Sequence, residues 1–153
     1  MVRRAFGAVV TMLMMVVVSS ACGSDAIVAD PTVAAFVGTW DADSLTMTSD
    51  ADTTVVANVL DFGSFVIIIE PSGQYTATLT VFGQSSPEIG QLTVQSGSTL
   101  TLAPTFPPGR PAASANYSFQ GDGDLTLEGP SEFDFNFDDI DEPAQAYTHL
   151  VRR

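Results

Sequence analysis

The strongest constraint on the fold is the alternation of apolar and polar residues that recurs along most of the chain. Between residues 74 and 81, Tyr75, Ala77 and Leu79 alternate with threonines. This period of two places the apolar side chains on one face of a β-strand and the polar side chains on the other. The same pattern recurs elsewhere, so the chain is predicted to be all-β. We expect strands at residues 37–48, 62–70, 74–82, 88–95, 99–103, 113–120, 124–128, 132–136 and 146–152.

Short segments rich in glycine, proline and serine separate many of these strands. Short connections favour antiparallel neighbours, which gives an up-and-down meander. About eight or nine strands are enough to close a small barrel, and closure removes the exposed edges of a long sheet. We therefore predict a small closed antiparallel barrel, and we keep a β-sandwich as the alternative. The predicted turns are residues 71–73, 96–98, 121–123 and 129–130.

Three segments depart from this alternation. Residues 65–69 are apolar on both faces, so this strand is covered on both sides or carries a hydrophobic patch. Residues 54–60 lack the β pattern and are predicted to form a short helix, although their β-branched residues disfavour one. Residues 105–111 contain three prolines and are predicted to be a surface loop.

The first 22 residues have the organisation of an export signal. Arg3 and Arg4 precede an apolar run over residues 5–18, which is short for a membrane-spanning helix. Small residues follow at 19–21, and then Cys22, the only cysteine of the chain. Residues 1–21 are therefore predicted to be a signal peptide. The first residues also resemble a twin-arginine export signal, although the positive charge equally suits general secretion.

The sequence Val-Ser-Ser-Ala-Cys at residues 18–22 resembles the lipobox of bacterial lipoproteins. Ala21, Cys22 and Gly23 fit the pattern, whereas Ser19 stands where the family usually has leucine. The resemblance implies that Cys22 receives a diacylglyceryl group and becomes the new N-terminus. Each buried methylene of such an anchor contributes about 0.8 kcal/mol. We therefore expect attachment to a membrane of the cell envelope, and in a host with two membranes the outer one, facing the periplasm. The alternative is a free cysteine after an ordinary signal peptide.

The remaining chain is a small acidic domain without lysine. Removing residues 1–21 leaves 132 residues, which carry all 18 acidic residues and three arginines, a net charge of −15 with histidine neutral. This charge repels phosphate backbones and makes nucleic acid an unsuitable partner. Residues 22–35 are predicted to be the lipidated cysteine and a flexible tether. Residues 36–153 form the predicted folded domain, which we expect to be monomeric.

The first predicted strand opens with Gly38-Thr39-Trp40, which contains the only tryptophan of the chain. This sequence resembles the Gly-x-Trp motif at the start of lipocalins and related calycin barrels. The resemblance implies that Trp40 plugs one end of the barrel and that an arginine of the last strand packs over it. Arg152 and Arg153 are both at the expected place, and the phase of the last strand decides between them. A non-barrel β-sandwich in which Trp40 is a core residue is the alternative.

No catalytic set is evident, so we expect a protein that is not an enzyme. His149 is the only histidine, and no activated nucleophile is evident near it in the sequence. The acidic residues 136–142 offer oxygen ligands of the kind that calcium uses, but they lack the spacing of a calcium loop. Zinc would need several histidine or cysteine ligands, and this chain has one histidine and one cysteine, the latter assigned to lipid. We therefore expect no metal, no cofactor and a solvated acidic loop.

The remaining function class is binding. A barrel of this size is filled by its own side chains or holds one small apolar ligand. We expect a small hydrophobic ligand or a partner in the cell envelope, and the alternative is a structural or interaction module without a ligand. The large inward candidates for a ligand cavity are Phe65, Tyr75, Leu79, Tyr117, Phe119, Phe133, Phe135 and Phe137.

Overall fold

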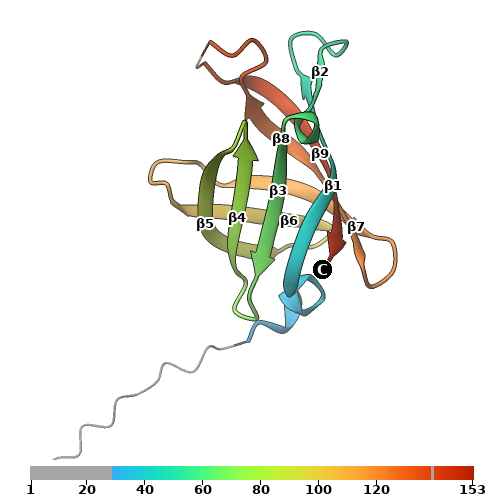
Figure 1. Cartoon of the computed structure of the whole chain (residues 1–153). Coiled ribbons are helices and arrows are strands. Elements are labelled where there is room, and N and C mark those ends of the chain that lie inside the picture. The colour runs from blue at the N-terminus through green and yellow to red at the C-terminus, as the bar shows by residue number, and fades with distance from the viewer. Residues whose placement is uncertain (1–28, 139) are drawn as a thin grey trace, which may run out of the picture.

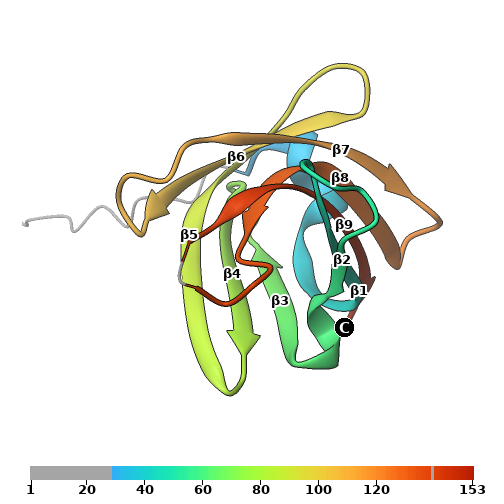
Figure 2. The same ribbon diagram turned by 90° about the horizontal axis from the view of Figure 1, so that it is seen from above.

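The computed structural model of the protein describes residues 29–138 and 140–153. Nine antiparallel strands form one sheet, and an additional pairing of β1 with β9 closes eight of them into a barrel, with β2 as an extra strand beside β1 (Figures 1 and 2). The predicted all-β meander and its closure are confirmed, and the β-sandwich alternative is wrong. The elements are η1 (Pro31–Phe36), β1 (Gly38–Ser49), β2 (Val56–Asn58), η2 (Val59–Asp61), β3 (Gly63–Ile69), β4 (Gln74–Val81), β5 (Gln84–Val94), β6 (Thr99–Phe106), β7 (Ala113–Phe119), β8 (Asp124–Phe133) and β9 (Glu142–Arg152).

A bulge in β1 sets the direction of its side chains. The register between β1 and β9 shifts between Ala42 and Ser44, so Asp43 has no partner in β9. Before the bulge, Trp40 faces the interior; beyond it, Leu45 and Met47 do so and are buried. The extra residue therefore moves the inward positions from even to odd numbers. One long strand can in this way supply side chains to both halves of the core.

The core consists of two clusters that occupy opposite halves of the barrel. One cluster lies at the end where η1 sits and contains Trp40, Ile67 and Tyr75, among other residues. The other cluster is built around Leu45, Met47 and Val59. Phe65 is half-buried and packs against both clusters. The 65–69 strand is apolar on both faces, as predicted, but its outward Ile68 is exposed.

The expected tether is folded in its last part. Residues 31–36 form η1, which begins with Asp30 accepting a hydrogen bond from the Thr32 amide. Val33 and Phe36 are fully buried at the end of the barrel. The prediction of a flexible tether up to residue 35 is therefore wrong for residues 31–35. These residues close the barrel, because the two apolar side chains fill its end.

Other predicted elements differ from the structure in their limits. The predicted helix at 54–60 is wrong for residues 56–58, which form the strand β2 as their β-branched residue favours, and the helical turn in this segment is the 3-10 helix η2 at residues 59–61. β6 extends to Phe106, so the predicted loop at 105–111 begins two residues later. β5 begins at Gln84 rather than at residue 88. The predicted turn at 129–130 is wrong, because β8 continues through Gly129 and Pro130, which pair with β9.

The barrel wall is incomplete in the half away from η1. β5 pairs with β6 only from Ile89 onward, and β8 pairs with β7 only as far as Glu128. Residues 84–88 and 129–133 therefore each have a backbone partner on one side only, among the strands described. Each of these segments contains a proline, Pro87 or Pro130, which has no amide hydrogen to donate. None of the helices within residues 29–138 and 140–153 is long and apolar enough to span a membrane.

Candidate functional site

The end of the barrel beside η1 is closed by an indole and a guanidinium group. Trp40 is completely buried, and its Nε1 donates a hydrogen bond of 2.7 Å to the carbonyl oxygen of Phe36. The Arg152 guanidinium carbon lies 4.3 Å from the centroid of the Trp40 ring. Gly38 has a φ of 142°, and a Cβ at that position would lie 3.1 Å from an Arg152 nitrogen. Gly38 therefore leaves the room in which the arginine lies over the indole.

The second terminal arginine has a different role. Arg153 points to the outer face, where its Nε and one terminal nitrogen donate to the two carboxylate oxygens of Asp41 at 2.8 and 2.6 Å. Arg152 instead pairs in register with Trp40. The phase of β9 therefore assigns Arg152 to the barrel end and Arg153 to the surface.

The half of the barrel beside η1 is filled by its own side chains. Phe36, Trp40 and Tyr75 are almost fully buried there. Tyr117 and Phe119 pack edge-on or tilted against Phe36, with ring centroids 4.9 and 5.0 Å away. Three of the predicted ligand-lining residues, Tyr75, Tyr117 and Phe119, thus belong to a packed core. Any ligand within the barrel would have to lie in the other half.

The other half of the barrel is less tightly sealed. Its inward side chains Phe65, Leu79, Phe133 and Phe135 are half-buried, although all of them pack against the second core cluster. Phe133 and Phe135 contact each other edge-on, with centroids 5.1 Å apart. The same half contains the incomplete stretch of wall between β5 and β8. An apolar lining with partial access to solvent is one feature of a small-molecule site.

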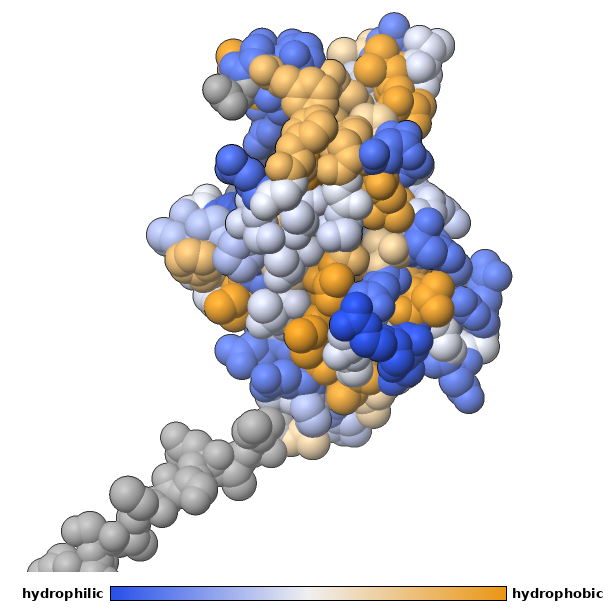
Figure 3. All heavy atoms as spheres, viewed as in Figure 1, coloured by the Kyte–Doolittle hydropathy of each residue, from blue (hydrophilic) through white to orange (hydrophobic). Residues whose placement is uncertain are grey.

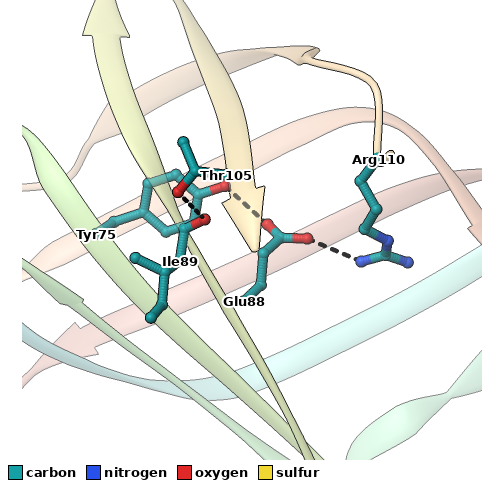
Figure 4. Close-up of polar contacts among 5 residues, drawn as sticks. All are labelled: Tyr75, Glu88, Ile89, Thr105 and Arg110. Carbon is teal, nitrogen blue, oxygen red and sulfur yellow. Dashed lines mark hydrogen bonds and ion pairs between the residues drawn. The ribbon is translucent and has the colours of Figure 1, made fainter. Parts of the chain in front are cut away.

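A polar group lies on the inward face of β5. Glu88 pairs in register with Ala77, whose side chain faces the interior, and accepts a 2.8 Å hydrogen bond from the Tyr75 hydroxyl. Its other carboxylate oxygen accepts from an Arg110 nitrogen at 2.8 Å. Figure 4 shows the three side chains in a row, with Thr105 donating to the carbonyl of Ile89 beside them. We call Tyr75, Glu88 and Arg110 the polar row.

The polar row links the packed core to the surface. Burial raises the pKa of the Tyr75 phenol above its usual range, and the hydrogen bond to Glu88 raises it further, so the hydroxyl stays protonated and remains a donor. Arg110 lies in the exposed loop between β6 and β7, and about half of its side chain is exposed. A guanidinium has five N–H donors, of which one is bonded to Glu88 here. The others are suited to an acceptor group on a bound molecule.

Sequence reasoning did not single out Glu88 or Arg110. The signal for Glu88 was nevertheless present, because Leu92 and Val94 face inward and positions 90 and 88 share their parity along the strand. The pairing of β5 with β6 shifts register between Ile89 and Gly90, but the pairing of β5 with β4 continues without a shift. Glu88 therefore faces the same side of the sheet as Leu92 and Val94. Arg110 carries no local signal, since it lies in a loop whose position depends on the whole barrel.

The remaining predicted lining residue, Phe137, does not face the interior. β8 ends at Phe133, and Phe137 lies in the following loop with 58% of its surface exposed. The expected alternation of residues 133, 135 and 137 in one strand is therefore wrong. The ring of Phe137 packs against Phe62 and Phe82 instead.

Two depressions lie on the outer face of β8 and β9, where β8 departs from β7. They have volumes of about 340 and 400 Å³, and both are wide open to solvent. Glu128, Gly129 and Gln145 line both of them. Gly129 comes close to β7, because a Cβ there would lie 2.8 Å from the Ser114 carbonyl oxygen. Depressions as open as these lack the enclosure of a small-molecule site.

His149 lies on the outer face of the barrel between two carboxylates. Its Nδ1 is 2.5 Å from an Asp43 oxygen, and its Nε2 is 3.8 Å from an Asp124 oxygen. Asp43 reaches the ring because it is the bulged residue of β1. Within the part of the chain that the structure describes, no group of three or more histidine, cysteine or acidic residues is placed to hold a metal ion. Cys22 lies outside the described residues.

The sequence has no match among protein-family models or curated proteins. Among solved structures, EF1p2_mFAP2b bound to DFHBI is similar to this chain, with a TM-score of 0.50 and 18% sequence identity. The alignment covers 78% of this chain and 94% of that chain. At this level of identity the likeness concerns the fold alone, the antiparallel β-barrel.

Proposed function

We propose that this protein is a lipid-anchored, lipocalin-like lipoprotein that binds a small hydrophobic molecule in the half of the barrel away from η1. The observation that carries the proposal is the contrast between the two halves. One half contains a cluster of eleven buried residues that includes Trp40, whereas the cluster in the other half contains three. The other has half-buried apolar side chains, an incomplete wall and the polar row nearby. The resemblance of Gly38-Thr39-Trp40 to the lipocalin motif and the bound compound in the similar barrel both support it.

The ligand class follows from the lining. Phe65, Leu79 and Phe133 offer an apolar surface, and the free donors of Arg110 offer a partner for one acceptor. The proposed ligand is therefore a largely apolar molecule that carries an acceptor such as a carboxylate or carbonyl at one end. Apolar contact supplies most of the binding free energy, and the single polar contact fixes the orientation.

The anchor is the second part of the proposal. Cys22 is the proposed site of acylation, and the domain beyond it carries a net charge of −15. Such a domain is repelled by an anionic leaflet, so covalent lipid is the means by which it stays at the envelope. The described chain enters the barrel through η1 (Figure 1). The proposed ligand half lies at the end of the barrel opposite η1, the element through which the chain from the proposed anchor continues into the barrel.

Native mass spectrometry of the protein purified from its own host tests the ligand. We expect a stoichiometric small molecule to be retained and identified by its mass. Leu79→Trp, which fills the ligand half, should abolish retention, whereas Thr78→Trp, its neighbour on the outward face of β4, should preserve it. Repeated absence of any bound molecule, or equal retention by both variants, would overturn the carrier proposal.

A metabolic label tests the anchor separately. Cells supplied with an alkyne analogue of palmitate should incorporate it into the wild-type chain and not into Cys22→Ala. The wild-type protein should fractionate with membranes and the variant should not. Equal labelling of both chains would show that Cys22 is not the acylation site, and this result would leave the ligand proposal unaffected.

A further inference from the structure

Three phenylalanine rings from separate segments meet at the end of the barrel opposite η1. Phe62 follows η2, Phe82 lies in the turn between β4 and β5, and Phe137 lies in the loop between β8 and β9. The ring centroids are 5.2 Å apart for Phe62 and Phe82, 6.0 Å for Phe62 and Phe137, and 5.8 Å for Phe82 and Phe137. We call these three residues the aromatic rim.

The aromatic rim is open to solvent although its rings pack against one another. Phe82 is 67% exposed and Phe137 is 58% exposed, the two highest values among the exposed aromatic residues described. An apolar area is visible at the upper end of the molecule in Figure 3, where the β4–β5 turn and the β8–β9 loop lie in Figure 1. Clustered exposed aromatic surface, unlike a single exposed ring, is typical of an interaction site.

Local backbone preferences do not account for the two exposed rings. Phe82 and Gly83 are the two central residues of a tight turn closed by the Val81–Gln84 pair, and their φ values are 49° and 79°. Such a turn favours asparagine followed by glycine, and a bulky residue in the left-handed region is unfavourable. Phe137 also has a positive φ, of 58°. Strained residues of this kind concentrate where function requires the side chain.

The charge around the aromatic rim selects its partner. Asp61 adjoins Phe62, Asp138 adjoins Phe137, and the β8–β9 loop carries further carboxylates. The segments 59–63, 81–84 and 134–142 contain no lysine, arginine or histidine. Two such surfaces would repel each other, and an anionic membrane or a nucleic acid would be repelled as well. A partner with positive charge and apolar side chains complements both the carboxylates and the exposed rings of the aromatic rim.

We propose that the aromatic rim docks a cationic polypeptide segment that carries aliphatic or aromatic side chains. The rings supply the apolar contact and, through their faces, additional attraction for the cationic groups. The surrounding carboxylates accelerate the encounter and favour cationic partners. This site lies at the outer end of the same half of the barrel as the proposed ligand, where Phe62 also packs against the second core cluster. If Cys22 is the anchor, the rim points away from the membrane toward other envelope proteins.

Three synthetic twelve-residue peptides test the proposal on the full chain, immobilised through its C-terminus, which lies at the closed end. One alternates lysine and leucine, a second alternates lysine and serine, and a third alternates glutamate and leucine. We expect surface plasmon resonance to detect saturable binding of the lysine–leucine peptide, weakened by added salt. The other two peptides should bind at least about tenfold more weakly, because each lacks one of the two complementary features.

The double variant Phe82→Asn, Phe137→Asn locates the site. Asparagine suits a positive φ, so the fold is retained while both exposed rings are lost. We expect the Kd for the lysine–leucine peptide to rise at least about tenfold. Ile68→Thr is the matched control, since it removes an exposed apolar side chain from the outer face of β3 and should leave the Kd unchanged.

Several results would overturn the proposal. One is equal binding of the lysine–serine peptide, which would indicate attraction by charge alone. Another is an unchanged Kd in the double variant. A third is self-association of the wild-type chain in sedimentation that the double variant abolishes, which would make a second copy the occupant. Failure of the carrier proposal in native mass spectrometry affects none of these readouts.

Discussion

Arg152 lies over Trp40 and at the same time holds the chain segment that precedes β1. Its terminal nitrogens donate to the carbonyl oxygens of Val37 and Ala35 at 2.5 and 2.7 Å, and its Nε donates to that of Asp122 at 3.1 Å. One side chain thus connects the indole, η1 and the β7–β8 turn.

We expect Arg152→Met to lower the free energy of unfolding by about 1–3 kcal/mol, because a charged donor to three carbonyls and a cation–π contact are lost. Urea denaturation measures the loss. Arg153→Met is the control: its ion pair with Asp41 is exposed, and its loss should cost about 0–1 kcal/mol. Equal losses in the two variants would contradict the role assigned to Arg152.

Gly90 is expected to tolerate no side chain. A Cβ there would lie 2.5 Å from the Ala103 carbonyl oxygen and 2.7 Å from the Tyr75 ring. Gly90→Ala should therefore destabilise the fold by about 1–3 kcal/mol through overpacking. Gly123→Ala is the matched control, because nothing lies within 4 Å of its added Cβ. Thermal unfolding of both variants should show a lowered Tm for the first alone.

Tyr75 makes the stability depend on alkaline pH. Burial raises the pKa of its phenol above the value of about 10 in the unfolded chain. The folded chain therefore keeps a proton that the unfolded chain loses, and the stabilising effect present below pH 10 declines as the pH rises further. We expect the free energy of unfolding to fall less steeply above pH 10 in Tyr75→Phe than in the wild type. Parallel curves from urea titrations at several pH values would contradict this expectation.

The Thr126 hydroxyl is buried on the outer face of β8 and has no hydrogen-bond partner in the described structure. Thr126→Val removes this unsatisfied group and keeps the shape, so we expect a gain of up to about 1 kcal/mol in the free energy of unfolding. Thr126→Ser keeps the hydroxyl, loses a buried methyl group and should be destabilising by about 1 kcal/mol. A loss in the valine variant would show that the hydroxyl has a partner.

Phe82 is expected to limit the stability of the fold. Phe82→Asn places a residue that accepts a positive φ in the tight turn, and we expect a gain of about 1 kcal/mol in the free energy of unfolding. Phe106→Asn, at an exposed aromatic position in a strand without positive φ, should be neutral or destabilising. A variant that is more stable and binds the lysine–leucine peptide less tightly would show that the phenylalanine at residue 82 serves binding at the expense of stability.

Alternation predicted the barrel well because burial decides the direction of each side chain. The strands at 62–70, 74–82 and 113–120 lie within a residue or two of their predicted limits. The pairing of Trp40 with an arginine of the last strand could be anticipated only from the lipocalin resemblance. The sequence does not show which of the two terminal arginines faces inward, because this depends on the register between β9 and β1. In the structure Arg152 pairs with Trp40 and therefore faces inward.

The errors have a common physical origin. Gly129 and Pro130 are typical turn residues, yet pairing with β9 keeps them extended, so a long-range contact overrides a local preference. Phe137 continues the alternation of Phe133 and Phe135, but β8 ends first, and loop hydrogen bonds to Asp134 direct the chain elsewhere. Glu88 is hard to predict as an inward residue because a carboxylate is not expected on an apolar face, although its position two residues before Gly90 places it on the same face of the strand as Leu92. The polar row therefore became visible only with the fold.

Pro87 and Pro130, which lie on the strand segments paired on one side only, also affect how readily the protein aggregates at high concentration. A strand with a free edge invites the same strand of a neighbouring molecule to pair with it, which is the first step toward aggregation. Pro87 and Pro130 each remove an amide donor from such an edge, and the exposed Glu132 adds charge to the edge that contains Pro130. The barrel thus keeps its wall open without presenting a template for intermolecular sheets. Where many copies lie close together on a surface, these prolines are expected to reduce strand pairing between molecules and so to limit aggregation.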